Sequence, residues 1–148
     1  MKANVLLYAG LFCLVLASLT ACNKDETVAT IPLTRLTATA TGMAEKPTSN
    51  TSTATGTFVG DLNEATRVLS YTVVYSGVTL TAGHLHRVTA ANGTGGVEFG
   101  FGVLTSPIIG TATLASQARV DSLKNGFYYV NLHSVRFPGG EIRGDIRK

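Results

Sequence analysis

The chain has 148 residues, of which 45% are hydrophobic and only 14% are charged, and its formal net charge is +3. Its lysines and arginines are scattered, whereas nucleic-acid binding needs clustered basic side chains, so nucleic acid is excluded as a partner. The two cysteines are Cys13 and Cys22. Nothing downstream of residue 22 can therefore form a disulfide, an iron–sulfur cluster or a cysteine nucleophile.

The first 21 residues have the form of a secretory signal. Lys2 precedes an apolar run from Val5 to Leu19, and small residues follow the run. This run has about 15 residues, fewer than the roughly 20 that a membrane-spanning helix needs. The tetrapeptide Leu19-Thr20-Ala21-Cys22 resembles the bacterial lipobox, which implies cleavage before Cys22 and acylation of its thiol.

This N-terminus predicts a lipoprotein signal peptide over residues 1–21, a lipidated Cys22 with a tether over residues 22–32, and a folded domain over residues 33–148. The length that remains after cleavage is that of one domain. Lys24-Asp25-Glu26 resembles a surface-export signal. We therefore expect a lipoprotein of the cell envelope, in the outer membrane or exposed on its surface. Its membrane contact is the lipid (palmitate) on Cys22, and an envelope protein or a glycan is a further candidate partner.

From Leu33 onward the chain has the pattern of short β-strands. Large apolar residues alternate with polar residues or glycines, which is the period of a half-buried strand, and threonine-rich runs suit strands as well. Only Ser116–Lys124 favours a helix, with Val120 and Leu123 on one side. We predict an all-β fold, an antiparallel β-sandwich of the immunoglobulin or superoxide-dismutase kind with one short helix. The expected strands include residues 36–41, 53–60, 69–75, 97–103, 128–132 and 142–146.

The three histidines fall in two places in the sequence, His84 with His86 and, farther on, His133. Residues two apart on a strand project from the same face, and His133 would join the pair if its strand lies nearby. Three neutral imidazoles suit zinc or copper and leave a fourth position open. Alternatively, the histidines are structural and hydrogen-bond the turn that precedes the last strand. Both roles fit the sequence.

The segments around the histidines resemble the CHRD domain, named after chordin. Gly83-His84-Leu85-His86 is similar to the family's His-x-His strand, and Tyr129–His133 followed by Pro138–Gly144 is similar to its C-terminal signature. Glu45-Lys46-Pro47 resembles its Glu-x-Pro turn, whereas Arg87 stands where the family usually has glycine. The resemblance covers about residues 33–147. It implies a structural role for the motif residues Asn131, Pro138, Gly140, Glu141, Arg143 and Gly144.

Other catalytic arrangements have little support in the sequence. No serine lies in a Gly-x-Ser-x-Gly elbow, and we expect Glu98 and Glu141 at exposed positions on alternating strands. We therefore predict a non-catalytic binding or scaffolding module without a cofactor. The alternative is a copper- or zinc-binding protein, or a metalloenzyme, that uses His84, His86 and His133.

Overall fold

The structure is a computed structural model in which residues 32–148 are described. The predicted signal peptide, Cys22 and most of the predicted tether lie outside the described residues. Secondary structure begins at Thr34, next to the predicted domain boundary at residue 33. Among residues 32–148, no helix combines the length and the apolar character needed to cross a membrane.

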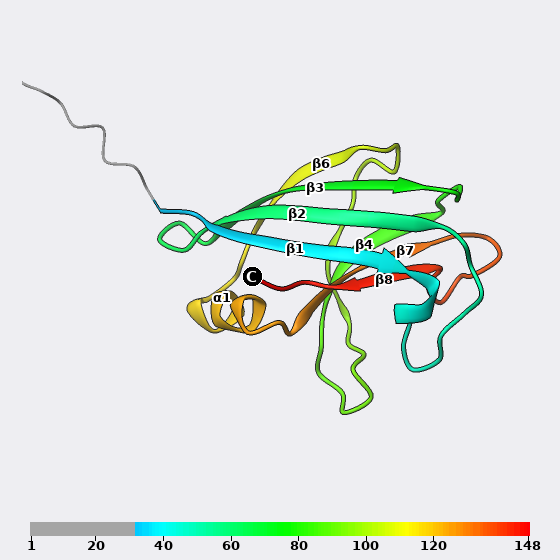
Figure 1. Cartoon of the computed structure of the whole chain (residues 1–148). Helices are drawn as coiled ribbons and strands as arrows, with labels where there is room; N and C mark the ends of the chain where they lie inside the picture. The colour runs from blue at the N-terminus through cyan, green and yellow to red at the C-terminus, as the bar shows by residue number, and fades with distance from the viewer. Residues whose placement is uncertain (1–31) are drawn as a thin grey trace, which may run out of the picture. The chain divides into compact units, whose positions relative to one another are not determined.

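The described chain contains eight strands, one α-helix and one short 3-10 turn, labelled in Figure 1 where there is room. The first half consists of β1 (Thr34–Thr41), η1 (Gly42–Ala44), β2 (Thr55–Asn63), β3 (Val68–Ser76) and β4 (Ala82–Arg87). The second half consists of β5 (Val97–Gly100), β6 (Ile108–Thr113), α1 (Gln117–Lys124), β7 (Tyr128–His133) and β8 (Ile142–Asp145).

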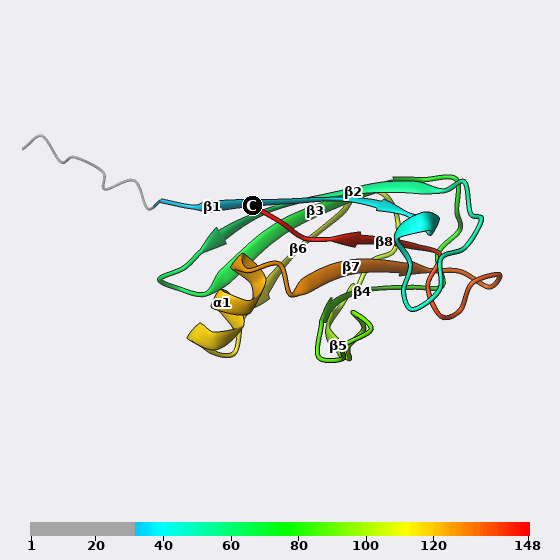
Figure 2. The ribbon, with the colours of Figure 1, turned by 60° about the horizontal axis from the view of Figure 1, so that its bottom comes forward.

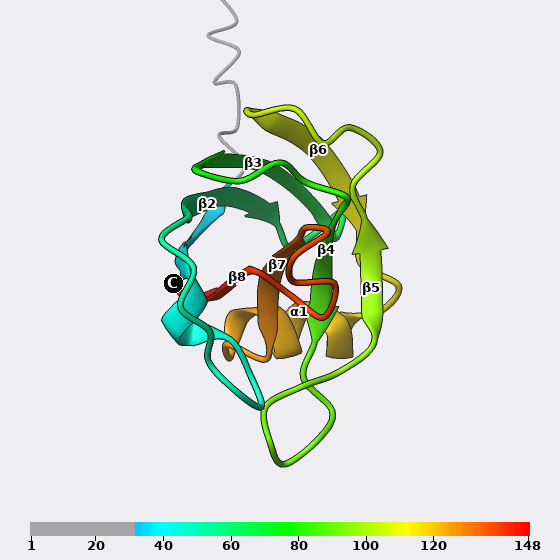
Figure 3. The same cartoon turned by 90° about the vertical axis from the view of Figure 1, so that its right-hand side faces the viewer.

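All eight strands belong to one antiparallel sheet with the order β5-β4-β7-β8-β1-β2-β3-β6. In the middle of this order, few residue pairs connect β1 to β8. The two strands pair only at Thr41 and Arg143, and an isolated bridge joins Thr37 to Arg147. The sheet bends at this seam, so β1, β2, β3 and β6 lie over β8, β7, β4 and β5 (Figure 3). The two layers confirm the predicted all-β antiparallel sandwich.

The core lies between the two layers. Inward side chains from both layers, among them Leu36, Phe58 and Val130, are fully buried. The helix α1 lies at one end of the layers, as Figure 2 shows, and buries Val120 and Leu123 completely. The single helix and its apolar side are therefore as predicted.

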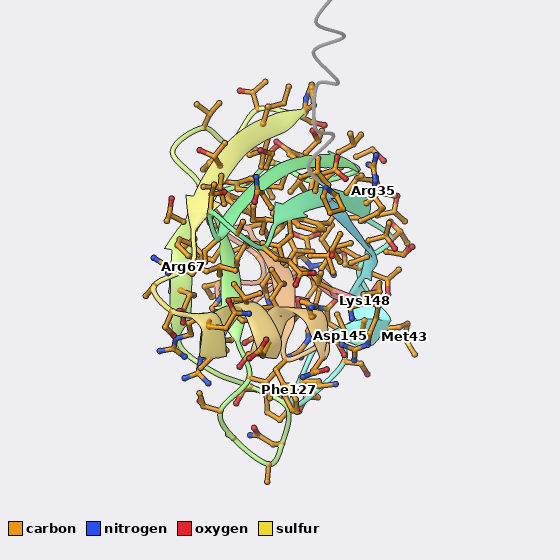
Figure 4. The ribbon with its side chains drawn as sticks, turned by 90° about the vertical axis from the view of Figure 1, so that its left-hand side faces the viewer. Arg35, Met43, Arg67, Phe127, Asp145 and Lys148 are labelled. Atoms are coloured by element: carbon orange, nitrogen blue, oxygen red, sulfur yellow. The ribbon has the colours of Figure 1, made fainter. Side chains whose placement is uncertain are left out.

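A few large apolar side chains remain outside the core. Met43 is 75% exposed and Phe127 is 52% exposed, and both are labelled in Figure 4. Isolated exposed apolar side chains of this kind are ordinary in folded domains.

The strand expected over residues 97–103 is shorter than predicted. β5 ends at Gly100, and of the large residues expected on one buried face only Phe101, at 9% exposure, is buried. Val97 and Val103 are 56% and 61% exposed. The prediction of a single apolar face for this strand is therefore wrong.

A β-bulge explains the exposure of Val97. Leu85 pairs with Phe99, but the next residue of β4, His86, pairs with Val97, so β5 carries one extra residue, Glu98. An extra residue reverses the faces on which the following side chains point. Val97 is thereby turned outward, and Glu98, expected to be exposed, is only 18% exposed in its side chain. Its ion-pair partners are Arg87 at 3.7 Å and Arg119 at 3.2 Å.

Candidate metal centre

The three histidines lie on the outer face of the layer that contains β4 and β7. The register pairs His84 with Asn131, two residues before His133. Because side chains alternate between the faces of a strand, Leu85 enters the core while its neighbours His84 and His86 point away from it. His133 is therefore a diagonal neighbour of His84 on the same face. The proximity that the sequence left open is observed.

The ring nitrogens of the three side chains converge. Nδ1 of His84 lies 3.1 Å from Nε2 of His133, and one nitrogen from each ring lies within 4.8 Å of the others. The ring centroid of His84 lies 5.4 Å from that of His86 and 4.9 Å from that of His133. His86 and His133 are buried and His84 is half-buried, so the cluster is accessible mainly at His84.

Backbone carbonyls fix the protonation of two of the rings. Nδ1 of His86 lies 3.0 Å from the carbonyl oxygen of Gly95, and Nδ1 of His133 lies 3.0 Å from that of Pro138. A carbonyl oxygen only accepts hydrogen bonds, so both Nδ1 atoms carry the proton and both Nε2 atoms carry a lone pair in the neutral rings. Histidines that bind metals are commonly held in this way. Nε2 of His86 is buried and has no hydrogen-bond partner among residues 32–148.

Burial keeps the three rings neutral. It lowers the pKa of His84, and the neighbouring His133 lowers it further. Burial is also the largest cause that lowers the pKa of His86 and that of His133, each partly offset by the hydrogen bond to its carbonyl. Since the ordinary pKa of histidine is about 6.5, all three imidazoles are neutral at pH 7. The neutral ring is the form that binds a metal ion.

Tyr129 supports His86 from the side of β7. The two rings are parallel to within 4° with centroids 4.8 Å apart, and the guanidinium of Arg143 lies 3.6 Å from the centre of the Tyr129 ring. Since β7 lies between β4 and β8, His86 and Arg143 approach Tyr129 from opposite sides. The Tyr129 hydroxyl lies 3.3 Å from both the amide nitrogen and the carbonyl oxygen of Gly95, the same carbonyl that holds His86.

Glu45 and Asn131 join two segments that are far apart in the sequence. Nδ2 of Asn131 donates to Oε2 of Glu45 at 3.1 Å, so the Glu-x-Pro turn meets the C-terminal signature. Burial raises the pKa of Glu45 to about 7, although the bond from Asn131 and the charge of Arg143 act in the opposite direction. Gly140 has a φ of 138° and covers both side chains.

The other motif residues also have structural partners. Pro138 supplies the carbonyl that holds His133. Glu141, expected to be exposed, is 7% exposed, because its strand end is covered by the segment before β2, and it accepts a hydrogen bond from Ser52 at 2.6 Å. A Cβ atom on Gly144 would lie 2.8 Å from the carbonyl oxygen of Thr39, so this glycine allows β8 to approach β1.

Gly95 belongs to this site although its sequence context did not indicate it. A Cβ atom at this position would lie 1.8 Å from the carbonyl oxygen of Arg87, so only glycine fits. The glycine-rich sequence of residues 91–96 carries no signal that one of its carbonyls holds His86.

Fold and site together define an all-β domain that holds three neutral histidines, with converging ring nitrogens, on one face of a sheet. The model of the CHRD domain family matches residues 36–146. The chain therefore belongs to the CHRD domain family, and the matched range contains the three histidines together with Glu45 and Arg143. Neither the curated proteins nor the solved structures yielded a match to this chain.

Proposed function

We propose that this CHRD domain binds a transition-metal ion, zinc or copper, as a non-catalytic module of the cell envelope. The ligands are Nδ1 of His84, Nε2 of His86 and Nε2 of His133. The observation that carries the proposal is that one ring nitrogen from each of the three histidines lies within 4.8 Å of the others. Zinc–nitrogen bonds of about 2.0–2.1 Å in a tetrahedral site put the ligand nitrogens about 3.3 Å apart, so the rings close from separations of up to 4.8 Å when the ion binds.

The unpartnered nitrogen of His86 favours metal binding over a purely structural role. A buried polar atom without a hydrogen bond costs about 1–3 kcal/mol, and Nε2 of His86 is such an atom. A bound ion would satisfy it. The same ion would replace the contact between His84 and His133 by two metal–nitrogen bonds. Ion binding alone accounts for this donor set, so no catalytic step is part of the proposal.

Metal binding is tested on the full-length protein, extracted in detergent without chelator. We expect bound zinc or copper by elemental analysis, and a higher melting temperature when zinc is added. At a free zinc concentration of one hundred times Kd, mass action raises the free energy of unfolding by about 2.7 kcal/mol. The variants His84→Ala, His86→Ala and His133→Ala should each lose this zinc-dependent shift.

The control for this experiment is the exposed Ser70→Ala variant, which changes a polar side chain of β3 in the other layer and should keep the full zinc-dependent shift. His133→Ala should also melt lower without metal, because it leaves the carbonyl of Pro138 without its donor. If wild type contains no metal, and neither zinc nor copper changes its melting temperature, the histidines are structural and the proposal is wrong.

The envelope location is supported by the sequence of residues 1–22. Acyl chains contribute about 0.8 kcal/mol per buried CH₂, and stable anchoring takes more than one membrane signal. Cys22→Ser should therefore release the protein from membranes or leave an uncut precursor, as measured by fractionation and intact mass. Cys13→Ser is the matched control, since Cys13 lies within the signal, and should leave anchoring unchanged. Retention of a processed Cys22→Ser protein in membranes would contradict the prediction.

A further inference from the structure

A cation is stacked behind one of the proposed ligands. Arg143 is 1% exposed and lies 3.6 Å from the centre of the Tyr129 ring, and the other face of that ring packs on His86. Within the part of the chain that the structure describes, Nη1 of Arg143 is buried without a hydrogen-bond partner. A guanidinium in such a desolvated position exerts a stronger field than one in water.

The positive charge of Arg143 is only partly balanced. Asp145 accepts from Nε and Nη2 of Arg143 at 2.9 and 2.8 Å. The same carboxylate, however, also pairs with Lys46 at 3.2 Å and with Arg147 at 3.5 Å. The single negative charge of Asp145 is thus shared among three positively charged side chains. The carboxyl of Glu45, the other acid near Arg143, has a pKa of about 7, so much of it is uncharged at neutral pH.

The proposed ligands bring no negative charge of their own. Among the described residues, the cluster consists of three imidazoles and includes no carboxylate or thiolate. Neutral donors leave the full charge of a bound ion uncompensated. A net positive neighbourhood therefore opposes a divalent ion more than a monovalent one, and copper is the ion in the imidazole-binding series that is also stable with a single charge.

We propose that the ion is copper and that the Arg143–Tyr129–His86 stack makes the centre prefer Cu(I) over Cu(II), an inference that rests on the proposed function. The stack fixes the orientation of His86 and brings the guanidinium charge near the metal through two parallel rings. Residues behind the ligands commonly tune a metal in this way.

The test compares two dissociation constants of the full-length protein at one pH. Cu(I) binding is measured without oxygen by competition with bicinchoninate, and Cu(II) binding by competition with glycine. Wild type should bind Cu(I) more tightly. Arg143→Gln should lower the ratio Kd(Cu(II))/Kd(Cu(I)) about tenfold, which corresponds to a reduction potential lower by about 59 mV.

Two further variants separate charge from structure. Arg147→Gln removes a cation that pairs with the same carboxylate but is 55% exposed and solvent-screened, so the ratio should change less than twofold. Asp145→Asn removes the balancing carboxylate, so the ratio should rise, the opposite direction from Arg143→Gln. If the two substitutions only loosened the fold, they would not change the ratio in opposite directions. Asp145→Asn also decides the question if Arg143→Gln does not fold.

The outcomes distinguish the two proposals. Cu(II) bound as tightly as Cu(I), or an unchanged ratio in folded Arg143→Gln, would overturn the inference and leave metal binding intact. A shift in the same direction in Asp145→Asn and Arg143→Gln would also overturn it. A wild type that binds neither zinc nor either form of copper would overturn both proposals.

Discussion

At the scale of single residues, Gly140 is a position near the centre where no side chain fits. A Cβ atom there would lie 2.7 Å from Oδ1 of Asn131 and 2.7 Å from Oε2 of Glu45. The φ of 138° is itself a conformation that residues with a side chain rarely adopt. Gly140 therefore allows the turn that carries Pro138 to close over the buried pair.

Gly140→Ala should destabilise the protein by at least about 1–3 kcal/mol, the usual cost of such a backbone conformation. The clash with the oxygens of Glu45 and Asn131 adds to this cost. Chemical denaturation measures the difference. Gly139→Ala is the matched control, because a Cβ atom at Gly139 meets no atom within 4 Å, and it should change stability by less than about 0.5 kcal/mol. Equal effects of both substitutions would contradict the explanation.

Glu45 predicts a specific dependence of stability on pH. Its pKa is raised from 4.5 to about 7 in the folded protein, so between these values the folded state binds more protons than the unfolded state. The contribution of Glu45 is then full below about pH 4.5 and is lost as the pH rises towards 7. At about 1.4 kcal/mol per pKa unit, the loss is roughly 3 kcal/mol.

Glu45→Gln isolates this effect, because glutamine keeps an acceptor for Asn131 but does not titrate. The histidines, whose pKa values are lowered, lose their contribution as the pH falls below 6.5, so they oppose Glu45 in wild type and remain in the variant. The free energy of unfolding of wild type minus that of Glu45→Gln should therefore fall between pH 4.5 and 7. A difference that is constant with pH would show that Glu45 is ionised throughout.

At the scale of elements, the sequence predicted the strands in which buried and exposed residues alternate regularly, and the helix in which the buried residues share one side. Leu69, Tyr71 and Val73 alternate in β3 and are buried as expected, and Val120 and Leu123 place α1 correctly. The local pattern could not predict β5, because its bulge depends on its pairing with β4. The alternation of residue types along one strand does not show whether that strand has an extra residue where it pairs with its neighbour.

β7 shows why the site was only partly predictable. Its inward residues follow the predicted alternation, but every residue from Tyr128 to His133 is buried. The outward residues are covered by loops that return from distant parts of the chain, through Gly95, Pro138 and Glu45. The spacing of His84 and His86 predicted a shared face. The approach of His133 depends on the pairing of β4 with β7, which neither segment specifies by itself.

At the scale of the whole molecule, the centre is built from segments spread over most of the domain. The residue after the η1 turn is Glu45, the β4–β5 hairpin contributes two histidines and Gly95, and β7 and β8 contribute His133 and Arg143. The geometry of the site is thus a property of the closed two-layer sandwich. It forms only when the β1–β8 seam and the β4–β7 pairing are both in place.

A final prediction concerns the independence of this domain. Residues 27–148 should fold on their own, because the strands and the buried core lie between Thr34 and Ile146 and the described residues form one compact unit. The segment contains no cysteine, so its melting temperature should be the same with and without reductant. Far-ultraviolet circular dichroism should show β-structure with little helix, since α1 spans only eight residues.

The matched comparison is the full-length protein in detergent, whose domain should melt at the same temperature if the lipid serves only as an anchor. A segment that is disordered without the first 26 residues, or a spectrum dominated by helix, would contradict this prediction. Because the histidine cluster requires the folded sandwich, the isolated segment should also keep the zinc-dependent rise in melting temperature. Loss of that rise in a folded segment would mean that residues upstream of 27 take part in binding the metal.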